Sequence, residues 1–342
     1  MRRHLHHASF PFLAWLTTLS FLAALPATAS AQAGGAQPNT DVSVIFTALD
    51  KDGKAVKDVK AEDVRLSADG VPVQPTSFKN QEDGPVFFTI AIDTSASEEK
   101  VLPTTKTIAG LFIKSMMRPG LDKAAVVTFA GDLTVEQAMS GEVDKVLEAV
   151  GRARFVPPPG YVGNGIIVGN PPAHGTFDKT GATGMWDAVS QIAGTLMPRS
   201  LGAGRRVLLL ITDGVDTSSQ VKSNKAVAAA LESGVIVYAI GIVDASYNDL
   251  DKRSLRKIAE QTGGRAFFPQ KVGDVTGSFK QISEGLSSQY VITFARAGAG
   301  RGDGPFHKLK IEVVNRSLRE RGVELTYPQE CYAGSAQTTP KK

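Results

Sequence analysis

The chain has 342 residues, enough for one α/β domain of about 200 residues and a smaller companion. Its formal net charge is +4, and it falls to +2 without residues 1–31, which hold two arginines and no acidic residue. A nearly neutral chain gives no electrostatic reason to expect nucleic-acid binding. The single cysteine, Cys331, excludes an internal disulfide. Beyond residue 31 the histidines are His174 and His307, too few for most zinc sites.

Residues 1–31 have the pattern of a secretory signal peptide. A basic tip is followed by an apolar run over 10–25 and by small residues at 29–31. We expect cleavage there, an exported protein that is periplasmic or secreted, and a small-residue linker over 32–40. A retained membrane anchor is the alternative for the first segment. No later stretch is apolar and long enough to span a membrane, so no span is expected after cleavage.

Short strands are expected in an N-terminal β segment over residues 41–82. Apolar residues alternate from residue 42, and further strands are predicted at 64–67 and 71–78, with Asp-Gly turns between them. This segment is too small to bury a core alone.

Strands and helices alternate over residues 86–288, which is typical of a parallel, doubly wound sheet. Strands are predicted at 86–92, 124–129, 133–138, 206–212, 235–241 and 265–268. Helices are predicted at 98–117, 142–151, 184–196, 222–233, 250–262 and 272–288. The strand at 133–138 is expected to be a short edge strand, joined to its predecessor by a hairpin.

A long stretch rich in proline and glycine, residues 155–178, has no periodicity and is expected to be a loop. Because it leads to Thr183, we expect it to lie beside the site described below. Ordered loops longer than about 15 residues tend to be functional. A disordered insertion that acts only as a spacer is the alternative.

A C-terminal β segment is predicted over residues 289–332, where apolar and polar residues alternate, and the tail over 333–342 is expected to be disordered. Neither β segment has enough apolar area to fold alone, and domain termini commonly lie close together. The expected fold class is therefore α/β, with a doubly wound, mostly parallel, Rossmann-like sheet inserted into a small β-sandwich-like domain. The two flanking segments together would form that small domain.

Oxygen-bearing side chains follow two of the buried strands. Asp93, Ser95 and Ser97 leave the end of the strand at 86–92, and Asp213 ends the strand at 206–212. Thr183 adds a hydroxyl in a loop directly before a helix. Ligand sites of α/β sheets lie at the carboxyl ends of the strands, and hard divalent cations prefer oxygen ligands. A set of helix caps is the alternative for the first three residues.

These five residues resemble the metal-ion-dependent adhesion site of von Willebrand factor A domains, which uses Asp-x-Ser-x-Ser with a distant Thr and a distant Asp. The layout of the chain resembles an exported bacterial subfamily of such proteins. The resemblance implies that Ser95, Ser97 and Thr183 bind the ion directly, while Asp93 and Asp213 hold its waters. Mg²⁺ is the expected ion, with Mn²⁺ and Ca²⁺ as alternatives.

The resemblance implies a metal-dependent adhesion or interaction module that captures a protein ligand. Three neutral hydroxyls leave a divalent charge poorly compensated, so a carboxylate of the partner is expected to complete the ion's shell. No enzyme activity is expected, because the cluster offers no His, Cys or Lys as base or nucleophile. Two alternatives stay open: phosphoester hydrolysis by a metal-bound water, and a structural envelope domain with an empty site.

Two further carboxylates near the cluster are left outside the ligand set. Asp187 is expected to act as a structural hydrogen-bond acceptor within a helix, and Asp216 as a loop cap. The identity of the partner, the ion used in the cell and the oligomeric state do not follow from the sequence.

Overall fold

The computed structural model describes residues 41–81, 84–163, 166–168, 181–202, 204–242, 250–295 and 305–332. The predicted signal segment over 1–31, the linker over 32–40 and the tail over 333–342 lie outside the described residues. Among the residues that are described, no helix has the length and apolar character needed to cross a membrane.

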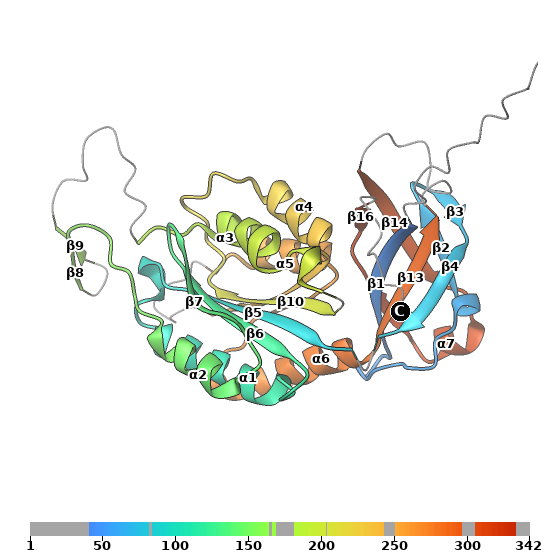
Figure 1. Ribbon diagram of the computed structural model, residues 1–342, viewed down its shortest axis with the longest axis horizontal. Helices are drawn as coiled ribbons and strands as arrows, with labels where there is room; N and C mark the ends of the chain where they lie inside the picture. Colours follow the sequence, from blue (N-terminus) through green and yellow to red (C-terminus); the bar gives the residue numbers. More distant parts are fainter. Residues whose placement is uncertain are drawn as a thin grey trace, which may run out of the picture. The chain divides into compact units, whose positions relative to one another are not determined.

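A six-stranded sheet forms the centre of the α/β part, in the order β12-β11-β10-β5-β6-β7 (Figure 1). Its strands are β5 (Val86–Asp93), β6 (Lys123–Phe129), β7 (Leu133–Ser140), β10 (Arg205–Thr212), β11 (Val235–Gly241) and β12 (Ala266–Phe267). All neighbours are parallel except β7, which pairs antiparallel with β6 at one edge. Every residue of β5 and of β10 is buried, as their continuous apolar runs predict.

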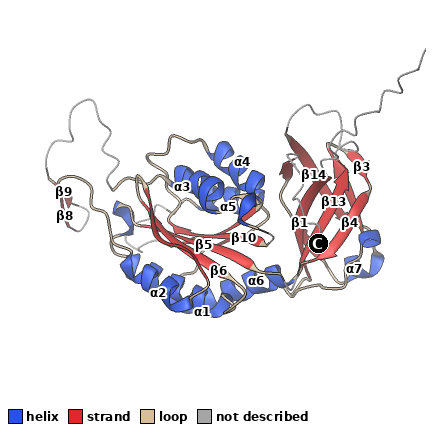
Figure 2. Cartoon of the chain, viewed as in Figure 1, coloured by secondary structure: helices blue, strands red, loops and turns tan. Residues whose placement is uncertain are grey.

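Helices cover both faces of this sheet (Figure 2). The helices are α1 (Leu102–Met116), α2 (Val143–Arg152), α3 (Met185–Gln191), α4 (Ser223–Ser233), α5 (Lys252–Gln261) and α6 (Val275–Ser287). Apolar side chains of α1, α2 and α6 pack in one core cluster with one face of the sheet. Those of α3, α4 and α5 pack in a second cluster with the other face. This is the doubly wound arrangement that the alternation of elements predicts.

The flanking segments form two antiparallel sheets, in the orders β15-β1-β13-β4 and β16-β14-β2-β3. The strands from the first segment are β1 (Asp41–Leu49), β2 (Val64–Ala68), β3 (Val71–Val73) and β4 (Pro75–Asn80). Those from the second are β13 (Gln289–Ala295), β14 (Phe306–Val313), β15 (Glu324–Thr326) and β16 (Glu330–Tyr332). Both sheets contribute to one buried cluster that includes Phe46, Leu66, Tyr290 and Ile311. The expected fold class is confirmed.

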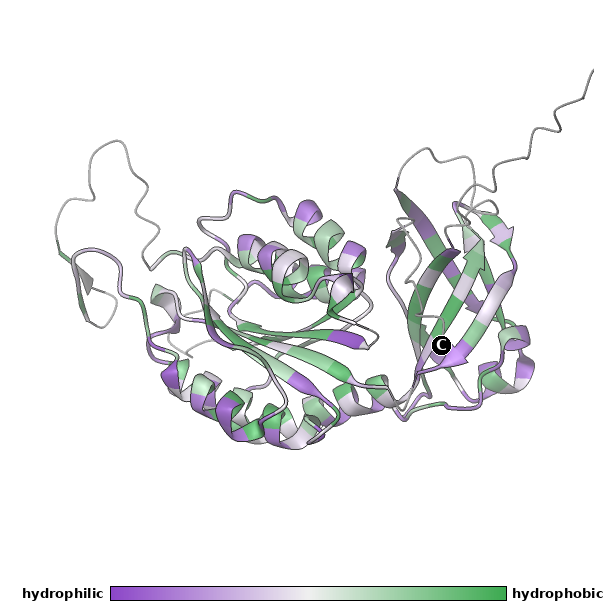
Figure 3. Cartoon of the chain, in the orientation of Figure 1, coloured by the Kyte–Doolittle hydropathy of each residue, from purple (hydrophilic) through white to green (hydrophobic). Residues whose placement is uncertain are grey.

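Hydrophobic residues concentrate on the strands of the central sheet, while the helices carry both hydrophobic and hydrophilic residues (Figure 3). In β14 the alternation is strict: its buried residues are His307, Leu309 and Ile311, and the residues between them are exposed. Strands with one buried and one wet face are what the alternating sequence of the flanking segments predicts.

Three local expectations need correction. The strand expected at 71–78 is two strands, because the chain leaves one sheet after β3 and enters the other at β4. The first helix begins at Leu102 rather than at residue 98, after a 3₁₀ turn (Ala96–Glu98). The loop at 155–178 contains a small hairpin of β8 (Tyr161–Gly163) and β9 (Ile166–Ile167), and residues 169–180 lie outside the described part. A short helix, α7 (Arg316–Glu320), was not expected.

Candidate metal centre

The site begins where two neighbouring parallel strands end. In the register of β5 with β10, Ile92 lies beside Ile211, so Asp93 and Thr212 come next on each strand. The hydroxyl of Thr212 donates a hydrogen bond to Oδ2 of Asp93. Asp213 follows directly, and its Oδ1 accepts the backbone N–H of Val215 at 2.9 Å. Adjacent strand ends therefore bring together two aspartates that are 120 positions apart in the sequence.

The turn after Asp93 places the two serines. Oδ1 of Asp93 accepts the backbone N–H of Ser95 at 2.9 Å, which fixes the turn against the carboxylate. The hydroxyl oxygens of Ser95 and Ser97 lie 3.3 Å apart. Asp93 and Ser95 are fully buried, with 0 % exposure, whereas Ser97 is exposed to solvent. One hydroxyl of the pair, that of Ser95, therefore lies beside the buried carboxylates, and the other, that of Ser97, lies at the surface.

Backbone hydrogen bonds connect the loop of Thr183 to both strand ends. The carbonyl of Gly181 accepts the N–H of Ala96 at 2.9 Å, which joins this loop to the turn that holds the serines. The N–H of Thr183 donates to the hydroxyl of Thr217 at 2.9 Å, and its carbonyl accepts the N–H of Thr217. Thr183 is buried between these segments. All five residues singled out in the sequence thus lie on segments that meet at the carboxyl ends of the central strands β5 and β10.

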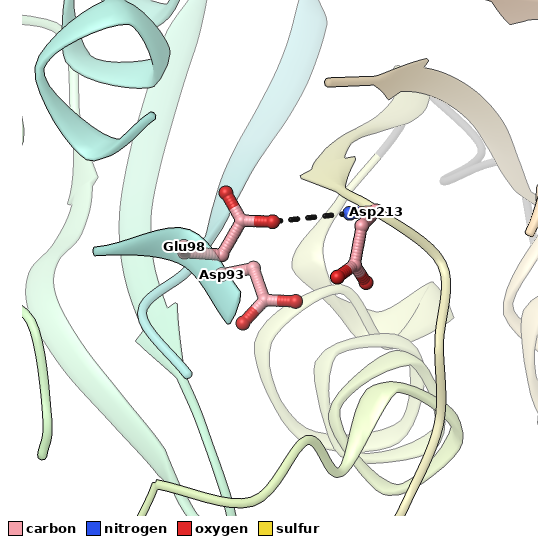
Figure 4. Close-up of side chains that lie close together, drawn as sticks. All are labelled: Asp93, Glu98 and Asp213. Carbon is pink, nitrogen blue, oxygen red and sulfur yellow. Dashed lines mark hydrogen bonds between the residues drawn. The ribbon is translucent and has the colours of Figure 1, made fainter. Parts of the chain in front are cut away.

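A sixth residue of this cluster, Glu98, did not emerge from the sequence. Its side chain is buried, and Oε1 accepts the backbone N–H of Asp213 at 3.2 Å (Figure 4). Carboxylate oxygens of Asp93, Glu98 and Asp213 all lie within 4.8 Å of one another. Glu98 is easily interpreted as a solvated acid of a first helical turn. A 3₁₀ turn has three residues per turn, so it carries Glu98 back over Ser95 and against the end of β10, and no local pattern in the sequence marks that burial.

Burial and mutual repulsion act on these acids. Burial is the main cause that raises the pKa of Asp93 to about 7, against hydrogen bonds from Thr212 and Ser95 that lower it. Burial, followed by the charges of Asp93 and Asp213, raises the pKa of Glu98 well above its ordinary value. No basic side chain among the described residues contributes to either shift. Acids held this close and this deep stay ionised together only with a compensating positive charge, and otherwise take up protons.

The donor set fits a hard divalent cation. It consists of carboxylate and hydroxyl oxygens, the ligands that Mg²⁺, Mn²⁺ and Ca²⁺ prefer. Oε2 of Glu98 is also buried and has no hydrogen-bond partner among the described residues. In Figure 4, Oε1 faces Asp93 and Asp213 and Oε2 points away from them, so Oε1 is placed for a cation and water bound beside it would satisfy Oε2.

Asp187 and Asp216 support the site without joining the carboxylate cluster. Asp187 accepts the backbone N–H groups of Gln220 and Val221, so its expected role as a structural acceptor is confirmed. Asp216 does more than cap a loop. Its Oδ1 accepts the N–H of Trp186 at 3.3 Å and the hydroxyl of Ser219 at 2.6 Å, which holds the start of α3 close behind Thr183.

Residues 174–282 match the family model of the von Willebrand factor type A domain. The matched range contains Thr183 and Asp213 and begins after Asp93, Ser95 and Ser97. No protein in a search of curated sequences matches the chain.

Several solved structures are similar to the chain at low sequence identity. A von Willebrand factor type A structure from Catenulispora acidiphila is 14% identical with a TM-score of 0.46, covering 86% of this chain and 75% of that one. The conserved hypothetical protein BatB from Bacteroides thetaiotaomicron is 17% identical with a TM-score of 0.44, covering 59% and 100%. Proximal thread matrix protein 1 from the mussel byssus, with a zinc-occupied MIDAS motif, is 17% identical with a TM-score of 0.46, covering 64% and 49%.

Proposed function

We propose that this chain is a cation-dependent protein-binding module in which Asp93, Ser95, Ser97, Thr183 and Asp213 hold a divalent cation. The cation, Mg²⁺ in the first instance and Mn²⁺ or Ca²⁺ as alternatives, would capture a carboxylate of a protein partner. The observation that supports this most is the meeting of the ends of β5 and β10 with the Thr183 loop around buried, closely spaced acids. The carboxyl ends of neighbouring strands are where α/β folds of this kind bind ligands.

The exposure of the five residues suggests how a partner would reach the ion. The two aspartates, Ser95 and Thr183 are buried, and Ser97 is the exposed member of the set. A carboxylate from outside would therefore approach beside Ser97. The described part of the loop at 155–178 is next to this approach, because Val156 donates its N–H to the carbonyl of Thr94 and Tyr161 bonds to Glu99.

Binding, rather than catalysis, is the proposed role. Among the described residues, the cluster presents carboxylates and hydroxyls but no His, Cys or Lys that would act as base or nucleophile at neutral pH. The signal-like pattern of residues 1–31 supports a binding event in the periplasm or outside the cell as part of this proposal. Envelope or secreted proteins with exposed acidic side chains are the partners we propose.

The cation is tested by thermal melts of the full chain in chelator and in millimolar Mg²⁺. A ligand that binds the folded state alone, at about 100 times its dissociation constant, stabilises that state by about 2.7 kcal/mol. We expect this gain for the wild type and its near-complete loss in Asp93→Ala, which removes the carboxylate that positions Ser95. Ser95→Ala and Thr183→Ala should each reduce the gain, because each removes one oxygen.

The matched control is Asp144→Ala, since Asp144 is an exposed acid of α2. Asp216 is unsuitable as a control because it supports the start of α3. Equal Mg²⁺-induced shifts for wild type and Asp93→Ala would place any ion elsewhere. Capture of the partner is tested by crosslinking from periplasmic extract with and without chelator, and capture that is unaffected by chelator would contradict a cation-mediated contact.

A further inference from the structure

Glu98 is the buried acid for which the five-residue ligand set gives no role. Its side chain is 1 % exposed, in a turn that faces the ends of β5 and β10. One carboxylate oxygen is used by the N–H of Asp213, and the other, Oε2, has no hydrogen-bond partner among the described residues. A buried carboxylate oxygen without a partner is strongly disfavoured, so its presence calls for a specific explanation.

A purely structural explanation does not account for Glu98. A structural carboxylate at this position would use both oxygens, as Asp122 does with the N–H groups of Val86 and Arg118 elsewhere in the chain. Glu98 instead has its charge within 4.8 Å of two other buried carboxylates, Asp93 and Asp213. Each of those carboxylates, when ionised, repels an ionised Glu98 at this distance. With all three acids ionised, the arrangement is unfavourable by itself and becomes favourable around a cation.

We propose that Glu98 is a further carboxylate of the cation site, which holds the cation on the protein when no partner is bound. This inference rests on the proposed function, because it concerns the same cation. Hydroxyl ligands alone would leave the ion's charge poorly compensated in the absence of a partner acid. The carboxylate of Glu98, inside the protein and beside Asp93 and Asp213, supplies negative charge in that state (Figure 4).

One consequence is that the cation does not depend on the partner for tight binding. With three resident carboxylates, the formal charge of a site with one divalent ion is −1, whereas the two aspartates without Glu98 give 0. The ion is then bound before the partner arrives. Affinity for a partner carboxylate is correspondingly weaker than at a site with hydroxyl ligands and fewer acids, since like charges oppose the incoming group.

The test is calorimetric titration of the full chain with Mg²⁺ alone, in the absence of any partner. Glu98→Gln keeps the size of the side chain and removes its charge, and we expect Mg²⁺ affinity to fall at least tenfold. The melting temperature in chelator should not fall, because the substitution also removes repulsion among buried acids. The matched control is Glu99→Gln, the same change at the next residue, whose carboxylate bonds to Tyr161 outside the cluster. Its Mg²⁺ affinity should stay within twofold of the wild type.

The outcomes separate the two proposals. If the wild type binds Mg²⁺ and Asp93→Ala does not, while Glu98→Gln binds as tightly as the wild type, Glu98 is not part of the site and the proposed function stands. If the wild type binds no Mg²⁺, both proposals fail. A lower melting temperature in chelator with an unchanged Mg²⁺-induced shift would mean that Glu98 is only structural. Should Glu98→Gln not fold, Glu98→Met is used instead, because it removes both carboxylate oxygens at this buried position. The same loss of Mg²⁺ affinity in the titration is then expected.

Discussion

At the residue scale, the buried carboxylates of this chain have two contrasting environments, one close to other acids and one with a full set of hydrogen-bond donors. At the candidate metal centre, three acids lie close together, and no basic side chain in the described part of the chain contributes to the pKa of Asp93 or Glu98. Near the other end of β5, Asp122 is equally buried but fully bonded. Its carboxylate accepts the backbone N–H groups of Val86 and Arg118 and two further bonds from the guanidinium of Arg118, all at 2.8–2.9 Å. The first arrangement is the proposed cation site, and the second stabilises the fold directly.

Asp122→Asn should therefore destabilise the protein. The substitution removes the charge that pairs with Arg118 and turns one acceptor oxygen into a donor that faces other donors. Because the Arg118 side chain is 42% exposed, we expect a loss of about 2 kcal/mol rather than the larger values of fully buried pairs. Glu142→Gln, which breaks the exposed pair with Lys145, should cost less than about 0.5 kcal/mol. Urea unfolding of both variants checks this, and equal small effects would contradict it.

Asp122 also predicts how stability changes with pH. Burial raises the pKa of this carboxyl, but hydrogen bonds from Arg118 and from the N–H of Val86 outweigh it and hold the pKa below its ordinary value. The unfolded state then binds the proton more readily, so stability is present above about pH 4 and is lost as the pH falls through the folded pKa. Unfolding of wild type and Asp122→Asn in chelator between pH 3 and pH 6 should show the difference between them shrinking toward the acid end. A constant difference would count against this.

At the element scale, the loop that carries Thr183 is positioned by a glycine. Gly181 has φ of +75°, and a Cβ at this position would lie 2.6 Å from the backbone nitrogen of Pro158. The same residue provides the carbonyl that bonds to Ala96. The loop at 155–178 and the turn that holds Ser95 therefore meet at a point where only glycine fits.

Gly181→Ala should both destabilise the protein and weaken Mg²⁺ binding, because the added methyl group pushes the Thr183 loop away from Pro158. The positive φ alone should cost about 1 kcal/mol. Gly120 is the matched control, since its φ is +76° and a Cβ there would meet nothing within 4 Å. Gly120→Ala should show the backbone effect without any loss of Mg²⁺ affinity. If the two variants behave alike in unfolding and in Mg²⁺ titration, contact with Pro158 does not position the loop.

The elements that the sequence predicts well are those with one dominant signal. Continuous apolar runs predict β5 and β10 within one residue at either end. The hairpin of β8 and β9 lies in a stretch of proline and glycine, where no periodicity exists to reveal it. Glu98 was missed for a related reason, because its burial depends on β10, which is more than 100 positions away. Local patterns predict elements, whereas contacts between distant segments decide which acids are buried.

At the scale of the whole molecule, the flanking sheets depend on both segments of the chain. β13 lies between β1 and β4, and both of these neighbours come from the N-terminal segment. β14 pairs with β2 from the N-terminal segment and with β16 from the C-terminal segment, to which β14 itself belongs. A single residue, Ser288, separates α6 from β13, so the α/β part is joined directly to a strand whose partners were synthesised first.

Removal of residues 1–83 should therefore unfold the flanking part and leave the α/β part folded. In the truncated chain, β13 loses both of its hydrogen-bonded neighbours, and its buried residues Tyr290, Ile292 and Phe294 lose the core that they share with β1. Amide hydrogen exchange gives a reading for each strand. We expect residues 289–295 to exchange without protection, while residues 205–212 of β10, paired with β5 and β11, stay protected as in the full chain. Protection of 289–295 in the truncated chain would show that the C-terminal segment folds without its partner. Loss of protection at 205–212 would show that the α/β part needs the flanking sheets for its own stability.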